Sequence, residues 1–93
     1  MASYSLSVRR SAEKELRRIP SKDLVRIVHR IKGLASQPRP VGVETLNSEE
    51  GLCRIRQGDY RIIYQVDDEK GEVVIIKIGH RREVYDHVRA LLR

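Results

Sequence analysis

The sequence predicts a small single-domain α+β protein over residues 1–93, with the order strand, helix, helix, strand, strand, strand, helix. The chain has 93 residues, a length that suits one domain. Apolar residues recur at helical spacing over residues 8–35, and they alternate as in strands from residue 52 onward. Helices that precede a run of strands favour an antiparallel meander sheet packed on a helical hairpin over a doubly wound sheet.

The first strand and the first helix are both short. Tyr4, Leu6 and Val8 alternate with serines, which is the period of a half-buried strand. Val8 also begins a stripe of apolar residues at helical spacing that extends to Ile19, and Pro20 ends this helix.

The second helix follows almost at once. Ser21 is its expected N-cap, and its apolar face runs from Leu24 to Ala35 before a proline-rich stretch ends it. Because the connection between the two helices is so short, we expect an antiparallel helical hairpin. Residues 37–51 hold two prolines, two glycines and few apolar residues, and we expect them to form a loop.

The meander begins with a hairpin over residues 52–66, "LCRIRQGDYRIIYQV". Gly58 and Asp59 are a two-residue turn signal with glycine first. This turn sets Arg56 opposite Arg61, and alternation then separates the two faces of the sheet. The core face is expected to hold Cys53, Ile55, Ile62 and Tyr64, and the other face Arg54, Arg56 and Arg61.

A third strand of the meander is expected over residues 73–78, after a polar turn. Continued alternation predicts Val74, Ile76 and Ile78 on the core face, and Val73, Ile75 and Lys77 on the arginine face. After Gly79, apolar residues at positions 84, 88, 91 and 92 predict a C-terminal amphipathic helix.

Composition limits the classes of function. A net charge of +6 and a pI near 9.9 favour an acidic partner, either nucleic acid or protein. The single cysteine, Cys53, excludes an intramolecular disulfide and is expected to be a small buried residue. We recognise no signal peptide, membrane-spanning run or metal-ligand spacing, so we expect a soluble cytoplasmic protein without metal, cofactor or membrane partner.

The three arginines on one sheet face predict a phosphate-binding surface. Like charges repel across a strand pair, so Arg56 opposite Arg61 is a locally unfavourable choice of the kind that function demands. Guanidinium groups bind phosphate through paired donors, and Lys77 is expected beside them. The alternative is that acidic side chains neutralise the arginines. The available acids are Glu44, Glu49, Glu50 and Glu83.

The segment "GHRREVY", residues 79–85, adds further candidates. Arg81 and Arg82 lie between the last strand and the last helix. His80 titrates near neutral pH and is either an acid–base group or a surface residue. Tyr85 is either a residue that stacks on a base or donates through its hydroxyl, or a half-buried packing residue. The remaining histidines, His29 and His87, have no partner at helical spacing and are expected on the surface.

Residues 52–66 and residues 78–85, "IGHRREVY", together resemble the RelE/ParE toxin superfamily of type II toxin–antitoxin systems. The element order of the whole chain also matches that fold. In the RelE branch, the resemblance implies a cytoplasmic ribonuclease that cleaves messenger RNA in the ribosomal A site. The 2′-hydroxyl attacks and a 2′,3′-cyclic phosphate results. The resemblance also implies a cognate antitoxin as partner, and operator DNA only as a toxin–antitoxin complex.

The resemblance assigns roles to individual residues. Arg61, Arg81 and Tyr85 match catalytic positions. Arg54 and Arg56 match substrate-binding positions that are often lysine in the family. Lys77, His80 and Arg82 are expected near these positions and are further candidates for binding the substrate. Arginine keeps phosphate binding but is always protonated. The acceptor of the 2′-hydroxyl proton therefore stays open among His80, Lys77 and Tyr85.

Two other functions are compatible with the same residues. The ParE branch shares the fold and much of the "GHRREVY" segment, and its members poison DNA gyrase without a ribonuclease site. A basic RNA-binding module without toxicity is the third alternative.

Overall fold

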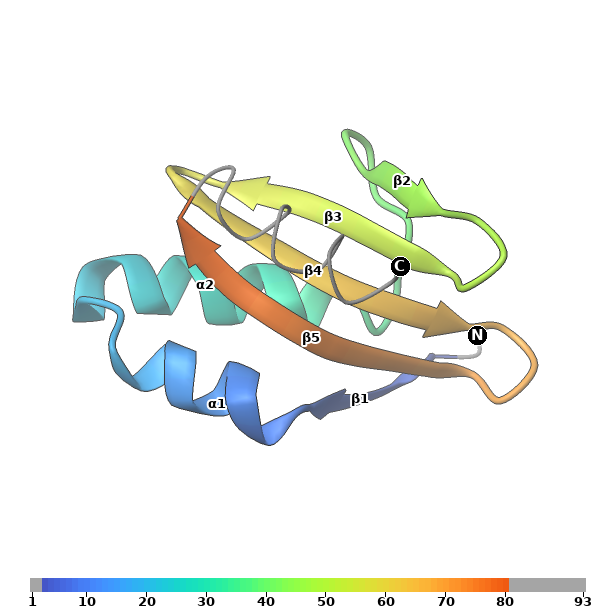
Figure 1. Cartoon of the computed structure of the whole chain (residues 1–93), viewed down its shortest axis with the longest axis horizontal. Coiled ribbons are helices and arrows are strands. Elements are labelled where there is room, and N and C mark those ends of the chain that lie inside the picture. Colours follow the sequence, from blue (N-terminus) through green and yellow to red (C-terminus); the bar gives the residue numbers. More distant parts are fainter. Residues whose placement is uncertain (1–2, 81–93) are drawn as a thin grey trace.

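The computed structural model describes residues 3–80 and has the predicted α+β architecture (Figure 1). In chain order, its elements are β1 (Ser5–Val8), α1 (Arg10–Arg17), α2 (Ser21–Gly33), β2 (Glu44–Asn47), β3 (Leu52–Gln57), β4 (Tyr60–Asp67) and β5 (Glu72–His80). The predicted C-terminal helix, with Arg81, Arg82, Tyr85 and His87, lies outside the described residues. Within residues 3–80, no helix is long and apolar enough to cross a membrane.

The five strands form one sheet in the order β1-β5-β4-β3-β2. β3, β4 and β5 are the predicted antiparallel meander. β1, however, pairs with β5 in parallel, an arrangement that the long connection between these two strands permits. β2 lies within the stretch predicted as a loop and pairs with β3. It has only four residues, too few for alternation to stand out in the sequence.

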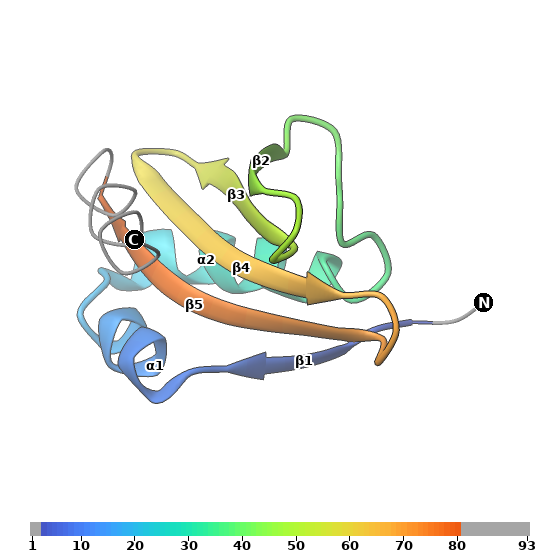
Figure 2. The same cartoon turned by 45° about the vertical axis from the view of Figure 1, so that its right-hand side comes forward.

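The helical hairpin covers one face of the sheet (Figures 1 and 2). α2 contributes Ile27 and Ile31 to the core, whereas α1 contributes Ala12 and lies beside the end of β5 (Figure 2). The strand residues buried in this core are Cys53, Ile55, Ile62, Tyr64, Val66, Val73, Ile75 and Ile78. Cys53 is thus a small buried residue, as predicted.

The helix boundaries differ slightly from the sequence pattern. α1 begins at Arg10 because Val8, the first member of the predicted stripe, belongs to β1. Ser21 is the first residue of α2 and not its N-cap. Pro20 takes that position, and its carbonyl accepts hydrogen bonds from the N–H groups of Asp23 and Leu24 at 3.0 and 2.9 Å. Proline suits this place because it has no N–H to satisfy and a preset φ.

The register of the β3–β4 hairpin confirms the prediction at every pair. Arg56 faces Arg61 and Ile55 faces Ile62, with Gln57 and Tyr60 closing the turn. Gly58 has a φ of 61°, the left-handed conformation that the first position of a two-residue hairpin turn requires. The turn therefore decides which side chains reach each face.

The predicted alternation in β5 is wrong over its first half. Ile63 faces Lys77, but the next pair is Tyr64 with Ile75, so the register shifts and Ile76 is an extra residue on β5. Such a bulge reverses the alternation on one side of it. Val73 and Ile75 consequently lie in the core, while Val74 and Ile76 lie toward the arginine face. Ile78 and Lys77, beyond the bulge, keep their predicted faces.

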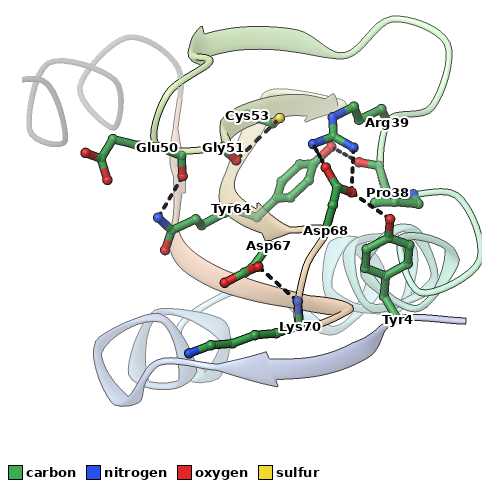
Figure 3. A network of polar contacts seen from close by, with 11 residues as sticks. Tyr4, Pro38, Arg39, Glu50, Gly51, Cys53, Tyr64, Asp67, Asp68 and Lys70 are labelled. Atoms are coloured by element: carbon green, nitrogen blue, oxygen red, sulfur yellow. Dashed lines mark hydrogen bonds and ion pairs between the residues drawn. The ribbon is translucent and has the colours of Figure 1, made fainter.

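A hydrogen bond of the buried residue Tyr64 allows its contribution to the stability of the fold to be tested. Its hydroxyl donates to the carbonyl oxygen of Pro38 at 2.7 Å (Figure 3), and burial raises the pKa of its phenol. Tyr64→Phe removes the donor from a partly buried carbonyl, so we expect a loss of about 1 kcal/mol in the free energy of unfolding, measured by urea titration. The control is Tyr4→Phe, because the hydroxyl of Tyr4 bonds Asp68 at an exposed position. Equal losses in the two variants would contradict the expectation.

Candidate nucleic-acid interface

The arginine face is the sheet face turned away from α2, and it carries Arg54, Arg56 and Arg61. Their neighbours along the chain, Ile55 and Ile62, pack into the helix-side core, so alternation turns the arginines to the opposite side. Arg56 is exposed, whereas Arg54 and Arg61 are half-buried. The structure therefore brings the three predicted arginines together on two adjacent strands.

Each arginine on this face has a different environment. Nη2 of Arg54 lies 2.6 Å from Oε2 of Glu44, its direct register neighbour on β2. Nη1 of Arg61 donates to the carbonyl oxygens of Gly58 and Tyr60 at 3.4 and 3.2 Å, which holds the guanidinium over the hairpin turn. The alternative prediction, that acidic side chains neutralise the arginines, therefore holds for Arg54, whose charge is paired with that of Glu44.

Arg56 contributes the most accessible charge of the three. Its side chain makes no hydrogen bond or ion pair with another residue of the described range 3–80, while its backbone carbonyl accepts from Nη2 of Arg30 at 3.5 Å. With Arg61 directly across the ladder, two like charges stand on neighbouring strands. A bound anion between them would relieve this repulsion.

Beside the arginines, the same face carries a small apolar cluster that the sequence did not reveal. Leu52 and Ile63 are buried there, with Leu46 and Ile76 packed against them. Ile76 reaches this face because of the bulge in β5, and Leu46 because β2 joins the sheet. Neither contribution follows from local alternation.

The structure places Lys77 differently from the arginines. It pairs in register with Ile63 and so begins on their face, but its ammonium forms an ion pair with the carboxylate of Glu15 on α1. The other oxygen of that carboxylate, Oε1, accepts a hydrogen bond from the backbone N–H of Ile78 at 3.1 Å. The charge of Lys77 is therefore compensated at the outer edge of β5.

His80 is not brought to the arginines either. It faces Tyr60 in register, and the two rings meet edge to face with centroids 5.3 Å apart and an interplanar angle of 84°. Tyr60 packs against the helix-side core, and His80 alternates with Gly79, which faces Arg61. His80 thus lies at the end of β5 on the face opposite the arginines.

A cluster of acids occupies the other end of the sheet, around the β4–β5 turn (Figure 3). Arg39 forms a bidentate ion pair with Asp68 at 3.1 and 3.0 Å, and the hydroxyl of Tyr4 donates to Asp68 at 2.6 Å. The Arg39 guanidinium, together with this hydroxyl, holds the pKa of Asp68 below its usual value. A cavity of about 480 Å³ opens there, and its charged lining residues are Arg39, Glu49, Glu50, Asp67, Asp68 and Glu69.

The charges of the described residues are unevenly distributed along the sheet. Arg56 and Arg61 flank the β3–β4 turn, which also carries Asp59. The acids at the opposite ends of the same strands are Glu49, Glu50, Asp67, Asp68 and Glu69. The remaining predicted site residues, Arg81, Arg82 and Tyr85, lie outside the described residues.

Comparison with known proteins gives the family. The family described as "ParE toxin of type II toxin-antitoxin system, parDE" matches residues 6–85. Toxin RelE of Mycobacterium tuberculosis is 35% identical over 83 residues, which cover 88% of this chain and 86% of that protein. Toxin RelG of the same organism is 31% identical over 83 residues, covering 88% and 95% of the two chains.

The fold agrees with this assignment. The archaeal RelE in the RelE–RelB complex from Pyrococcus horikoshii superposes with a TM-score of 0.80 at 26% identity, over 88% of this chain and 99% of that one. Sequence and fold thus point to the same group of proteins. The chain belongs to the RelE/ParE superfamily of toxins from type II toxin–antitoxin systems.

Proposed function

We propose that this toxin is a ribosome-dependent endoribonuclease that cleaves messenger RNA in the ribosomal A site and so inhibits translation. The observation that carries the proposal is the Arg56–Arg61 pair on a sheet face turned away from the core. Two facing guanidinium groups are suited to the phosphate backbone of RNA. The similarity to RelE toxins supports the same reading.

The proposed reaction is an in-line transfer at phosphorus. The ribose 2′-oxygen forms a bond to the adjacent phosphorus, and the bond from phosphorus to the 5′-oxygen breaks. The products are a 2′,3′-cyclic phosphate and a 5′-hydroxyl. One group accepts the proton of the 2′-hydroxyl and one donates a proton to the leaving oxygen. Arg61 and Arg81 stabilise the charge that develops on the phosphoryl oxygens. Arg54, Arg56 and Arg82 position the RNA backbone.

The contacts of Lys77 and His80 bear on which residue accepts the proton of the 2′-hydroxyl. Lys77 is paired with Glu15, and His80 lies on the face opposite the arginines. Of the three candidates in the sequence, these placements favour Tyr85, which also serves to orient a base.

A cognate antitoxin is the proposed protein partner. The RelE of Pyrococcus horikoshii was solved in complex with RelB. By analogy, this chain would bind its own antitoxin, and operator DNA would be a partner of that complex only.

Induction of the chain in bacteria tests the proposal. We expect new messenger 5′ ends within translated regions, mapped by primer extension, and their loss when translation is blocked. Arg81→Ala and Tyr85→Ala should abolish these cuts, because each removes a group that acts on the reacting phosphate. Arg17→Ala, which removes an equal charge from exposed α1, should leave them unchanged. Growth arrest without translation-dependent cuts would exclude the ribonuclease.

Inhibition of DNA gyrase is the second candidate function, favoured by the match of residues 6–85 to the ParE toxin family. A supercoiling assay with purified gyrase distinguishes the two candidates. Inhibition of gyrase by a chain that cleaves no messenger would replace the ribonuclease proposal.

A further inference from the structure

Glu15 on α1 makes two contacts with the end of β5 through its two carboxylate oxygens. Oε2 pairs with the ammonium of Lys77, and Oε1 accepts the backbone N–H of Ile78 at 3.1 Å. Both charged side chains are largely shielded from solvent, with 22% of Glu15 and 26% of Lys77 exposed. The other ion pair of this helix, Glu13 with Arg17, is exposed and stays within α1.

These contacts occur where β5 is no longer paired with β1 on its outer edge. The pairing of β1 with β5 ends at Val8 and Ile75, followed by one hydrogen bond from the N–H of Arg9 to the carbonyl of Ile75 at 3.0 Å. Beyond that point the N–H of Ile78 faces outward from the sheet, and the Glu15 carboxylate satisfies it. Beyond the end of β1, Glu15 therefore supplies the hydrogen-bond acceptor for the outer edge of β5.

The inner edge of the same segment is fixed by β4. Gly79 faces Arg61, and His80 faces Tyr60. The end of β5 is thus held between Arg61 on one side and Glu15 on the other. Arg81 follows His80 by a single peptide bond. Whatever fixes the end of β5 also fixes the residue to which Arg81 is bonded.

We propose that Glu15 is a positioning residue for the cleavage reaction. By holding Lys77 and Ile78, it sets the end of β5 against Arg61, and so fixes the strand end to which Arg81 is joined in the chain. This inference rests on the proposed ribonuclease function. In this proposal Lys77 acts by pairing with Glu15, and it does not contact the RNA directly.

Single-turnover cleavage of messenger on programmed ribosomes, at increasing toxin concentration, tests the role of Glu15. Glu15→Ala should lower the maximal rate constant about tenfold, since small misplacements of reacting groups cost rate rather than binding. The half-saturating toxin concentration should stay within about twofold. Glu15→Gln should recover most of the rate because its amide oxygen still accepts from Ile78. Glu13→Ala, the matched control on the same helix, should behave as wild type.

A double-mutant cycle with Lys77→Met separates positioning from RNA contact. If Lys77 acts through Glu15, its loss has no further effect in the Glu15→Ala background. A rise in half-saturating concentration on loss of Lys77 in both backgrounds would overturn the inference, as would wild-type rates for Glu15→Ala. Should Glu15→Ala melt below the assay temperature, Glu15→Asp replaces it, with the same slower rate expected from its shorter reach. An inactive wild-type chain would instead refute the proposed function itself.

Discussion

Replacing Arg61 by alanine should slow messenger cleavage about 10²–10³-fold, the usual cost of removing one preorganised donor from a site of developing charge. Arg61 lies opposite both Arg56 and Gly79, and its guanidinium is held over the hairpin turn by the carbonyls of Gly58 and Tyr60. Because the guanidinium is already ordered, little reorganisation is needed when the phosphate binds. Single-turnover cleavage on programmed ribosomes measures the effect.

Two further variants make the Arg61 result specific. Arg61→Lys keeps the charge but loses the planar pair of donors, so its rate should fall between those of wild type and Arg61→Ala. Arg17→Ala removes an exposed charge of α1 and should cleave normally. Thermal unfolding monitored by circular dichroism shows whether the variants are folded. If folded Arg61→Ala cleaves as fast as wild type, Arg61 has no catalytic role.

Gly51→Ala should destabilise the fold by about 3 kcal/mol or more. Gly51 precedes β3 with a φ of 68°, and an added Cβ would lie 2.2 Å from the carbonyl oxygen of Val66. That distance is far inside van der Waals contact. The clash is with backbone, and the N–H of Val66 also donates to the carbonyl of Gly51 at 2.9 Å, so neither segment can move without breaking the pairing of β4.

The matched control for Gly51 is Gly58→Ala. Gly58 has a φ of 61°, close to that of Gly51, but an added Cβ would have no neighbour within 4 Å. Its substitution should cost only the left-handed strain, about 1–2 kcal/mol. The difference between the two variants in urea unfolding isolates the steric clash. Equal losses would show that the segment before β3 relaxes freely.

The sequence predicted the β3–β4 hairpin with its full register because the information is local. A two-residue turn at Gly58 and Asp59 fixes which residues face one another, and alternation fixes the faces. The same locality explains the success with the helical hairpin, where apolar spacing and Pro20 gave both helices to within a few residues.

The failures have a common physical origin in long-range pairing. The bulge at Ile76 lies just beyond Ile75, where the pairing of β5 with β1 on one edge ends while its pairing with β4 on the other edge continues. β2 exists because a four-residue segment can join β3, and its own sequence gives no periodic signal. The alternation of apolar residues along a strand therefore could not predict the bulge or the strand β2.

The candidate site divides in the same way. The sequence by itself determined that Arg54, Arg56 and Arg61 share one sheet face, since a local turn and the two-residue period of a strand suffice for that. Only the tertiary structure decided how each charge is used. Glu44 reaches Arg54 from a strand that the sequence concealed, and Glu15 reaches Lys77 from a helix 62 residues earlier in the chain. Electrostatic partners depend on distance in space, and the packing of α1 and β2 on the sheet sets that distance.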